Sequence, residues 1–542
     1  MDTLSIRDII GPIMIGPSSS HTAGALRIAY MARRLCLAEP RTVEFSLLGS
    51  FAHTLVGHGT DKALVGGMLG LDTDDLRIRD SFQLAREAGL AFSFTPEPDA
   101  EYDHPNTVDI RIVDADGSEM SIRGESIGGG AAVIRRIDGI DVEVTGEKTS
   151  IVIRQRDEAG VLAHIAKSIS DWGVNIATTR MYRERKGDAA YTILETDQAV
   201  CPEIKTAIEA HPAIRDVRII PGDSATGVSK DDAADVEAAQ TRFDELDFPH
   251  GAAMLAFCER SGMSISEAFL EREDALAASL GYASDTDGYL DEALAVMRQS
   301  ATRPLEEPLP SMGGLIGGEA LKLSALRKLG GNLCDDQLSL AIAYSMAVLE
   351  TNASMGRIAA APTAGSAGVI PGVLLALQDS RGFSDEDLKR GLACAGAIGY
   401  LITRNATVSG AEGGCQAEIG SAAAMAAAAA VELAGGTPAQ CFAAASNALT
   451  NMMGLVCDPI AGLVEVPCQK RNAAGAATAL VSAQIALAGI GNLVDFDQTV
   501  EAMRKVGRSL PFELRESALG GIAATPAACG FCASCTPGMS CS

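Results

Sequence analysis

The chain has 542 residues, which is too long for one hydrophobic core and predicts three or four domains. Its formal charge of −26 argues against nucleic acid or an anionic membrane surface as a partner, because both demand a basic surface. Hydrophobic residues make up 47% and aromatic residues 4%, so small and aliphatic side chains must build the cores. Residues 1–12 hold acids and no long apolar run, so we expect no signal peptide and a cytosolic protein with reduced thiols.

Residues 1–145 are expected to form an α+β domain. The Gly- and Ser-rich loop GPIMIGPSSSHTAG (11–24) leads into a helix predicted over Thr22–Leu35, since apolar residues recur there three and four apart. Serines ahead of a helix can cap its free N–H groups, and the same terminus attracts anions such as a carboxylate. The candidate donors to such an anion, some of which can equally serve only as caps, are Ser18, Ser19, Ser20 and Thr22.

Two histidines precede helices in this domain. His21 lies in SSSHTAG, and His58 lies in GSFAHTLVGHGTDKALVGGMLG (49–70), which is predicted to run from a loop into a helix. The positive end of a helix favours a neutral imidazole, which can act as a base, although a capping or packing role fits the sequence equally well. Alternating apolar residues predict strands over 42–48, 107–113 and 120–123.

Residues 149–222 follow a different pattern. Strand, helix, strand, strand, helix and strand are predicted over 150–155, 160–171, 174–183, 190–196, 202–210 and 214–220. This βαββαβ order predicts a ferredoxin-like sandwich. With DEAGVL (157–162) at its first strand–helix turn, the segment resembles an ACT domain, a small-molecule regulatory module. The resemblance implies an amino-acid effector near Gly160 and Asn175, bound across a pair of domains, and hence a homodimer.

The polar and acidic residues 223–240 are predicted to be a linker, and residues 241–542 to be an Ala-rich, all-α domain without a convincing strand. Two uncharged stretches, 358–377 and 472–494, are interrupted by Pro, Gly or polar residues, so buried segments are favoured over membrane spans. Gly-rich loops open at 311–326 (SMGGLIGGEALKLSAL) and at 361–372 (APTAGSAGVIPG). No G-K-[ST] ending supports a nucleotide-binding loop, and no clear strand before MGGLIGG supports a dinucleotide fold.

Three cysteines in Gly- or Pro-rich turns are the strongest candidates for chemistry. Cys415 lies in SGAEGGCQAEIG (409–420), Cys457 in GLVCDPIAG (454–462), and Cys468 in VEVPCQKRNAAG (464–475). They are not spaced in the close pairs of a zinc knuckle, and a reducing compartment argues against disulfides. Folding could bring the three together to ligate an iron–sulfur cluster; plain buried cysteines are the alternative.

These segments resemble the cluster-binding motifs of the iron–sulfur L-serine dehydratases, in which three cysteines hold a 4Fe–4S cluster with one iron left open for substrate. The resemblance extends over nearly the whole chain. GPSSSHTAG, GHGTDKALVGG, HPNT (104–107) and GESIGGG (124–130) are similar to signatures of the family's β domain, and the loops at 311–326 and 361–372 to motifs of its α domain. It implies a single chain that carries β, ACT and α domains in that order.

The resemblance also implies roles for individual residues. Cys415, Cys457 and Cys468 would ligate the cluster, whose open iron would act as a Lewis acid while L-serine is converted to pyruvate and ammonia. His21 or His58 would remove the α-proton, and the serines of the first loop, together with Thr363 and Ser366, would contact the substrate. All seven histidines lie at or before His250, so such a site must form between the first and last domains.

The C-terminal segment 520–542 is rich in cysteine, with C-x2-C-x2-C spacing at Cys529, Cys532 and Cys535, and its Gly and Pro content predicts a mobile end. It departs from the shorter endings expected of the family. Some relatives place a C-terminal cysteine on the open iron in the resting state. Cys541, next to last in this chain, matches that role best.

Three other functions remain open at this stage. Threonine or cysteine could replace serine as the substrate. A non-catalytic sensor could pair a cluster with an ACT module, although it would not need the SSSHTAG and GHGT loops. A pyridoxal-phosphate dehydratase would need a Schiff-base lysine and a phosphate cup, and no lysine of the sequence lies in such a setting.

Overall fold

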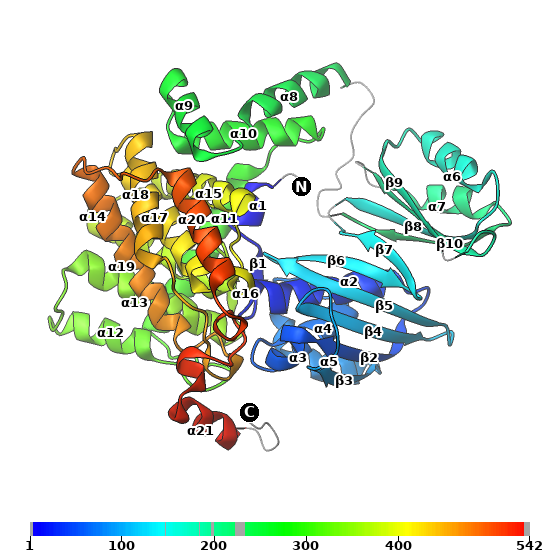
Figure 1. Ribbon diagram of the computed structural model, residues 1–542, viewed down its shortest axis with the longest axis horizontal. Helices are drawn as coiled ribbons and strands as arrows, with labels where there is room; N and C mark the ends of the chain where they lie inside the picture. Colours follow the sequence, from blue (N-terminus) through cyan, green and yellow to red (C-terminus); the bar gives the residue numbers. More distant parts are fainter. Residues whose placement is uncertain (1–3, 147, 184, 197–199, 223–232, 536–542) are drawn as a thin grey trace.

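The computed structural model describes residues 4–146, 148–183, 185–196, 200–222 and 233–535. A mixed sheet with helices, a smaller sheet with two helices, and a large helical part follow one another along the chain (Figure 1). Within the described ranges, no helix combines the length and apolar character that a membrane crossing requires.

The first part is built on a six-stranded sheet with strand order β3-β2-β4-β5-β6-β7. β2 and β3 run parallel, and every other neighbouring pair is antiparallel. Helices pack against this sheet around a shared apolar core (Figure 1). The elements are β2 (Pro40–Leu48), α3 (Gly49–Thr54), α4 (Thr60–Met68), α5 (Ser81–Ala88), β3 (Ala91–Glu97), β4 (Asn106–Asp114), β5 (Glu119–Gly128), β6 (Ala131–Ile137) and β7 (Ile140–Val144).

The first loop enters its helix through a wide turn. Residues Ser19–Gly24 form a single π-helical turn that continues into α2 (Ala25–Arg34), and turns of this kind occur often at functional sites. The predicted apolar face of the helix is confirmed, because Ala25, Ile28, Ala29 and Ala32 are all completely buried. One expectation is corrected. The segment before His58 is not a loop, since α3 occupies Gly49–Thr54.

Residues 149–220 form a four-stranded antiparallel sheet of order β11-β8-β10-β9, with two helices on one face. Its predicted βαββαβ order of elements is confirmed: β8 (Thr149–Arg156), α6 (Val161–Ser170), β9 (Ile176–Arg183), β10 (Ala189–Thr196), α7 (Pro202–Glu209) and β11 (Ile214–Ile220). Along β8, Ile151 and Ile153 face the two helices, whereas Val152 faces the opposite side and joins the core of the first part. Tyr191 on β10 packs in the same core as Val152, and its hydroxyl donates to Asp138 Oδ2 at 2.9 Å.

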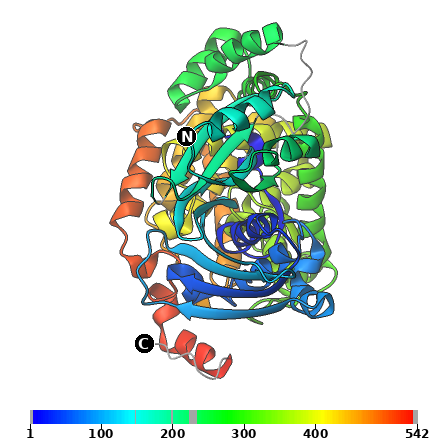
Figure 2. The same ribbon diagram turned by 90° about the vertical axis from the view of Figure 1, so that its right-hand side faces the viewer.

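The helical part surrounds α17, whose residues Ser421–Val431 are all buried. Nine of the thirteen residues in this helix are Ala or Ser, so neighbouring helices approach it closely on every side (Figures 1 and 2). The helices are α8 (Ala233–Leu246), α9 (Gly251–Ser261), α10 (Ile265–Ser279), α11 (Thr286–Thr302), α12 (Glu319–Lys328), α13 (Asp336–Ala353), α14 (Val369–Arg381), α15 (Asp385–Asn405), α16 (Gly410–Gly413), α17 (Ser421–Leu433), α18 (Pro438–Met452), α19 (Cys468–Leu487), α20 (Phe496–Ser509) and α21 (Pro526–Cys535).

The N-terminal residues pack in the helical part rather than in the sheet domain that they precede. We call residues 4–15 the N-terminal strap. Its helix α1 (Ile6–Ile9) lies in the helical core, and Ile6 N–H donates to Glu273 Oε2 at 2.8 Å. Its strand β1 (Ile13–Ile15) pairs antiparallel with β12 (Arg357–Ala359). The expectation that no strand occurs after residue 241 is therefore wrong at β12.

Two further expectations change. The predicted linker 223–240 is helical over its last part, because α8 begins at Ala233, and residues 223–232 lie outside the described ranges. The predicted mobile end is helical through α21, up to Cys535. Cys541 lies outside the described residues, so its proposed contact with an open iron stays a prediction.

Candidate active site

A small cavity lies where the first loop meets the helical part, and we call it the inner cavity. Its volume is about 10 Å³, which is room for about one water molecule. Residues of the sheet domain and of the helical part both line it, as the positions of the histidines and cysteines in the sequence require. The lining residues are Pro17, Ser18, His58, Gly365, Cys415, Glu418, Ile419, Cys457, Pro459, Val464, Cys468 and Glu516.

The three predicted cysteines meet at this cavity from three separate elements. Cys415 precedes the π-helical turn Gln416–Gly420, which opens α17. Cys457 lies in the loop after α18, and Cys468 is the first residue of α19. All three are buried, with exposed fractions of 2%, 3% and 7%. Cys415 and Cys457 lie with Glu418 in one group of donor atoms within 4.8 Å of one another, and Cys468 lines the same cavity.

A carboxylate and a guanidinium accompany these thiols. Glu418 Oε2 lies 4.0 Å from Cys415 Sγ and 3.9 Å from Cys457 Sγ. Arg471 Nη1 lies 3.5 Å from Cys415 Sγ, and the same guanidinium pairs with Asp458 at 2.8 Å. Burial raises the pKa of Glu418. A positive charge beside buried sulfur stabilises thiolate over thiol, as metal ligation requires.

The donor chemistry of the cysteines suits an iron–sulfur cluster. The hydrogen bond with Cys415, and then burial, raise the pKa of the Cys457 thiol; burial raises that of Cys468. Without a bound metal ion, the thiols of Cys457 and Cys468 keep their protons. A bound metal ion displaces such protons, and thiolates are the usual ligands of iron–sulfur clusters.

The two predicted histidines lie together but have different surroundings. Their ring centroids are 4.4 Å apart and the planes meet at 75°. His21 Nε2 contacts Ser50 Oγ at 2.8 Å, and its Nδ1 contacts Ser20 Oγ at 3.1 Å. For His58, neither ring nitrogen has a hydrogen-bond partner among the residues that the structure describes. His58 is thus the histidine with nitrogens available to a ligand.

Burial keeps both imidazoles neutral. It lowers the pKa of His58 from 6.5 to about 3. It also lowers the pKa of His21 well below its ordinary value, and the neighbouring His58 and His104 add to that effect. A neutral imidazole with an unpartnered nitrogen can accept a proton at neutral pH.

The hydroxyls of the first loop divide into two groups. Ser18 lines the inner cavity, and its Oγ accepts the His21 N–H at 3.1 Å. Ser20 contacts the His21 ring, and Thr22 Oγ1 donates to the carbonyl oxygen of His58 at 2.7 Å. Ser19 is buried but is not among the residues that line the cavity. Ser20 and Thr22 therefore position the histidines, and Ser18 faces the cavity.

The loop at 361–372 reaches the cavity through its backbone. Gly365 lines the cavity, whereas Thr363 and Ser366 are not among its lining residues. The Thr363 hydroxyl donates to Glu418 Oε1 at 2.8 Å, and the Ser366 hydroxyl donates to the Ala361 carbonyl at 3.2 Å. A Cβ on Gly365 would lie 3.0 Å from Glu418 Oε1, which explains why glycine suits this position.

Sequence reasoning missed three charged residues of the site. Glu418 and Arg471 lie within the two quoted motifs that contain Cys415 and Cys468, so proximity to those cysteines was an available signal. Glu516 had none. It is 7% exposed, its φ is +60°, and one of its carboxylate oxygens lies within 4.8 Å of a nitrogen of each of His21 and His58. Burial, and then Glu418, raise its pKa well above the ordinary value.

The remaining predicted residues lie elsewhere. Gly160 and Asn175 are exposed in the four-stranded unit, at the start of α6 and just before β9, and neither lines the inner cavity. Cys529 is half-buried in α21.

Comparison with known proteins matches both main parts of the chain to described families. Residues 5–136 match the family described as serine dehydratase beta chain. Residues 260–523 match the family described as serine dehydratase alpha chain.

Individual relatives agree with this division. The chain is 50% identical over 237 residues to the probable L-serine dehydratase alpha chain of Bacillus subtilis, which covers 44% of this chain and 79% of the relative. It is 41% identical over 208 residues to the L-serine dehydratase beta chain of Peptoniphilus asaccharolyticus, covering 38% and 94%. It is 32% identical over 539 residues to the L-serine dehydratase of Streptomyces coelicolor, covering 96% and 98%.

Proposed function

The chain belongs to the L-serine dehydratase family, and on that premise we propose that it eliminates water from L-serine at the inner cavity and yields pyruvate and ammonia. One observation carries the proposal. Three buried cysteines line the same small cavity as a histidine whose two ring nitrogens have no partner among the described residues, and different parts of the chain contribute them. Family membership also favours an enzyme over a non-catalytic sensor.

His58 is the proposed base. Its nitrogens have no described hydrogen-bond partner, and burial lowers its pKa to about 3, so the ring is neutral at neutral pH and offers a free lone pair to the α-proton, although the same burial makes it a weaker base than an exposed histidine. His21 is held by Ser20 and Ser50 and packs edge-on against His58, so we assign it a positioning role. Ser18 lines the inner cavity and is the proposed hydroxyl contact to the substrate.

Cys415, Cys457 and Cys468 are the proposed ligands of a 4Fe–4S cluster. When bound, a cluster with an open iron would supply a Lewis acid toward the departing hydroxyl group. Arg471 lies against Cys415 Sγ, and Thr363 fixes Glu418 beside the thiols. The three cysteines and Thr363 are buried and Glu418 and Arg471 are half-buried, which limits the access of bulk water to the reacting groups.

We further propose that residues 149–222 form an ACT-like unit which binds an amino-acid effector, in a protein that assembles as a homodimer. Gly160 and Asn175 are exposed and lie apart from the inner cavity, as an effector site requires. Asn175→Ala should then change how the rate depends on serine concentration while the rate at saturation is kept. An unchanged dependence would contradict the assignment.

The function is tested on protein purified without oxygen. Cys415→Ala, Cys457→Ala and Cys468→Ala should each abolish visible absorbance and pyruvate formation from L-serine. Cys334→Ala is the matched control, because this cysteine lies just before α13 and does not line the inner cavity. A variant that keeps full iron content and full activity would remove its cysteine from the ligand set.

His58→Gln separates the base from the ligands. It should keep the iron and the absorbance while the rate falls by about 100-fold or more, the usual contribution of a general base. Loss of iron in step with activity would instead make His58 structural or ligating.

A further inference from the structure

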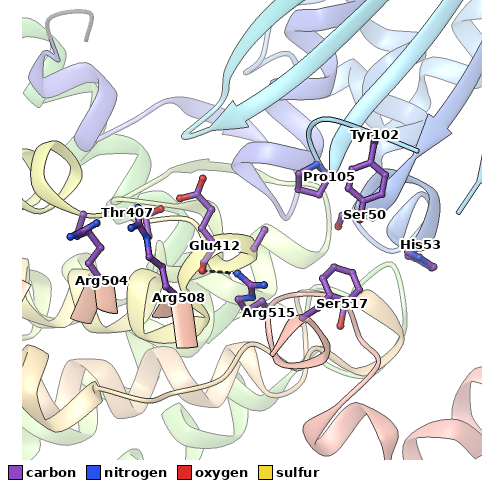
Figure 3. A pocket seen from close by; sticks show the side chains of 13 residues that line it. Ser50, His53, Tyr102, Pro105, Thr407, Glu412, Arg504, Arg508, Arg515 and Ser517 are labelled. Atoms are coloured by element: carbon purple, nitrogen blue, oxygen red, sulfur yellow. Dashed lines mark hydrogen bonds between the residues drawn. The ribbon is translucent and has the colours of Figure 1, made fainter. Parts of the chain in front are cut away.

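A second, larger cavity opens at the junction between the sheet domain and the helical part (Figure 3). Its volume is about 440 Å³, within the range of small-molecule sites. Ser50, His53 and Tyr102 line it from the sheet domain, and Arg504, Arg508 and Arg515 line it from the helical part. We call it the arginine pocket.

The positive charge of this pocket contrasts with the rest of the molecule. The chain carries a formal charge of −26, yet three guanidiniums line this one cavity, and Glu412 is the single carboxylate among its lining residues. Such a local excess of positive charge in an acidic protein attracts small anions.

Two of the three arginines have hydrogen-bonding capacity to spare. Arg504 is paired with Glu501 at 2.6 Å. Arg508 forms no ion pair with any described side chain. Arg515 Nη1 donates to the carbonyl oxygen of Glu412 at 3.4 Å, but its Nε is buried and lacks a partner among the described residues. A buried donor without an acceptor is costly, and a bound anion would satisfy it.

Only one layer of residues separates the arginine pocket from the inner cavity. Glu516 lines the inner cavity, whereas its neighbours Arg515 and Ser517 line the arginine pocket. The same segment is bonded to a proposed cluster ligand, since Glu516 N–H donates to the Cys457 carbonyl at 2.9 Å. On the other wall, Ser50 touches the His21 ring at 2.8 Å.

The two cavities differ in what they can admit. The inner cavity of about 10 Å³ must widen before it can admit an amino acid, whereas the outer one of about 440 Å³ has room for an amino acid as it stands. A guanidinium binds a carboxylate through two parallel hydrogen bonds, and the exposed Glu412 supplies the opposite charge that an α-ammonium group needs.

We propose that the arginine pocket is an outer chamber in which Arg508 and Arg515 bind the carboxylate of the amino-acid substrate before it passes to the inner cavity. This inference rests on the proposed function. Its ligand class is a small monocarboxylate, which includes the product pyruvate.

The test compares Arg508→Gln and Arg515→Gln with wild type and with Lys505→Gln. Lys505 is the matched control: it lies on the same helix α20, is paired with Glu501 at 3.3 Å, and does not line the pocket. Both arginine variants should raise KM for L-serine about tenfold with kcat within about twofold, because a carboxylate contact is lost but the reacting groups are kept. The control should keep KM, and iron content should match wild type in all variants.

A second readout does not need catalysis. Calorimetry with pyruvate should show binding to wild type that weakens about tenfold in both arginine variants, and raising the salt from about 20 mM to about 200 mM should weaken it further. Arg515→Lys should restore part of the affinity, since it restores the charge.

The outcomes separate the possibilities. If KM and pyruvate affinity both stay unchanged in the two variants, the pocket does not bind carboxylates and the inference fails. If pyruvate affinity falls but KM does not, the pocket is an effector site rather than an outer chamber for substrate, which also overturns it. If the wild-type protein deaminates no serine, the proposed function is refuted. If pyruvate binding is nevertheless weakened in both arginine variants, the carboxylate site still stands.

Discussion

Acidification should weaken the folded protein through His58, whose side chain is completely buried. Burial lowers its pKa to about 3, so the folded chain keeps the ring neutral over the range where the unfolded chain, with an ordinary value near 6.5, takes up a proton. The unfolded state then binds more protons, so stability falls as the pH falls below about 6.5.

The size of this effect follows from the two pKa values. Between about pH 7.5 and about pH 5.5, protonation of an ordinary histidine in the unfolded chain costs the folded state about 1.4 kcal/mol. The folded value of about 3 leaves His58 neutral at both ends of that range, so the whole amount is lost. His21 adds a loss of the same sign, because its pKa is lowered too.

Urea denaturation followed by far-ultraviolet circular dichroism measures this loss on protein handled without oxygen. His58→Gln cannot titrate, so its loss of unfolding free energy between the two pH values should be smaller than that of wild type by about 1.4 kcal/mol. The direct effect of the substitution cancels in this difference of differences. An equal loss in wild type and variant would refute the reasoning, since His58 would then titrate alike in the folded and unfolded chains.

Three substitutions test contacts away from the proposed ligands. Glu465→Gln should lower the unfolding free energy by about 2 kcal/mol, because the buried carboxylate accepts three hydrogen bonds from the loop at 311–315; an unchanged urea midpoint would contradict this. Gly24→Ala should lower Tm despite its better helix propensity, since a Cβ would lie 2.0 Å from Ser126 Oγ, whereas the control Gly491→Ala meets nothing within 4 Å. Tyr191→Phe should lower the unfolding free energy by about 1.5 kcal/mol by removing its hydrogen bond to a carboxylate, and equal stability would show that this contact contributes nothing.

The local pattern of apolar residues was enough to predict elements such as β8 and α2, because the pattern lies within the element itself. In β8, Ile151, Val152 and Ile153 alternate between two cores, and the apolar face of α2 follows from a spacing of three and four residues. The cysteines were found because their motifs are long, and the structure brings all three to one cavity.

What the sequence could not supply depends on contacts between distant residues. β1 and β12 have three residues each, which is too short to show an alternating apolar pattern. They pair although more than three hundred residues separate them in the chain. Glu516 reaches the histidines only through the fold, and no motif surrounds it. His21 and His58 were indistinguishable in sequence, and only their hydrogen-bond partners separate the held ring from the available one.

The N-terminal strap attaches the sheet domain to the helical part independently of the later peptide link between them. Ile6 and Ile9 are buried among helices that come more than two hundred residues later, and β1 is hydrogen-bonded to β12, so the sheet domain is anchored in its partner before the chain ever crosses residues 223–232. A protease nick inside that segment should therefore leave the two fragments together as a non-covalent pair. The family described as serine dehydratase beta chain matches residues 5–136 and the one described as alpha chain matches residues 260–523, one on each side of such a cut. Fusion in this chain then guarantees equal numbers of the two halves, and the strap supplies their attachment.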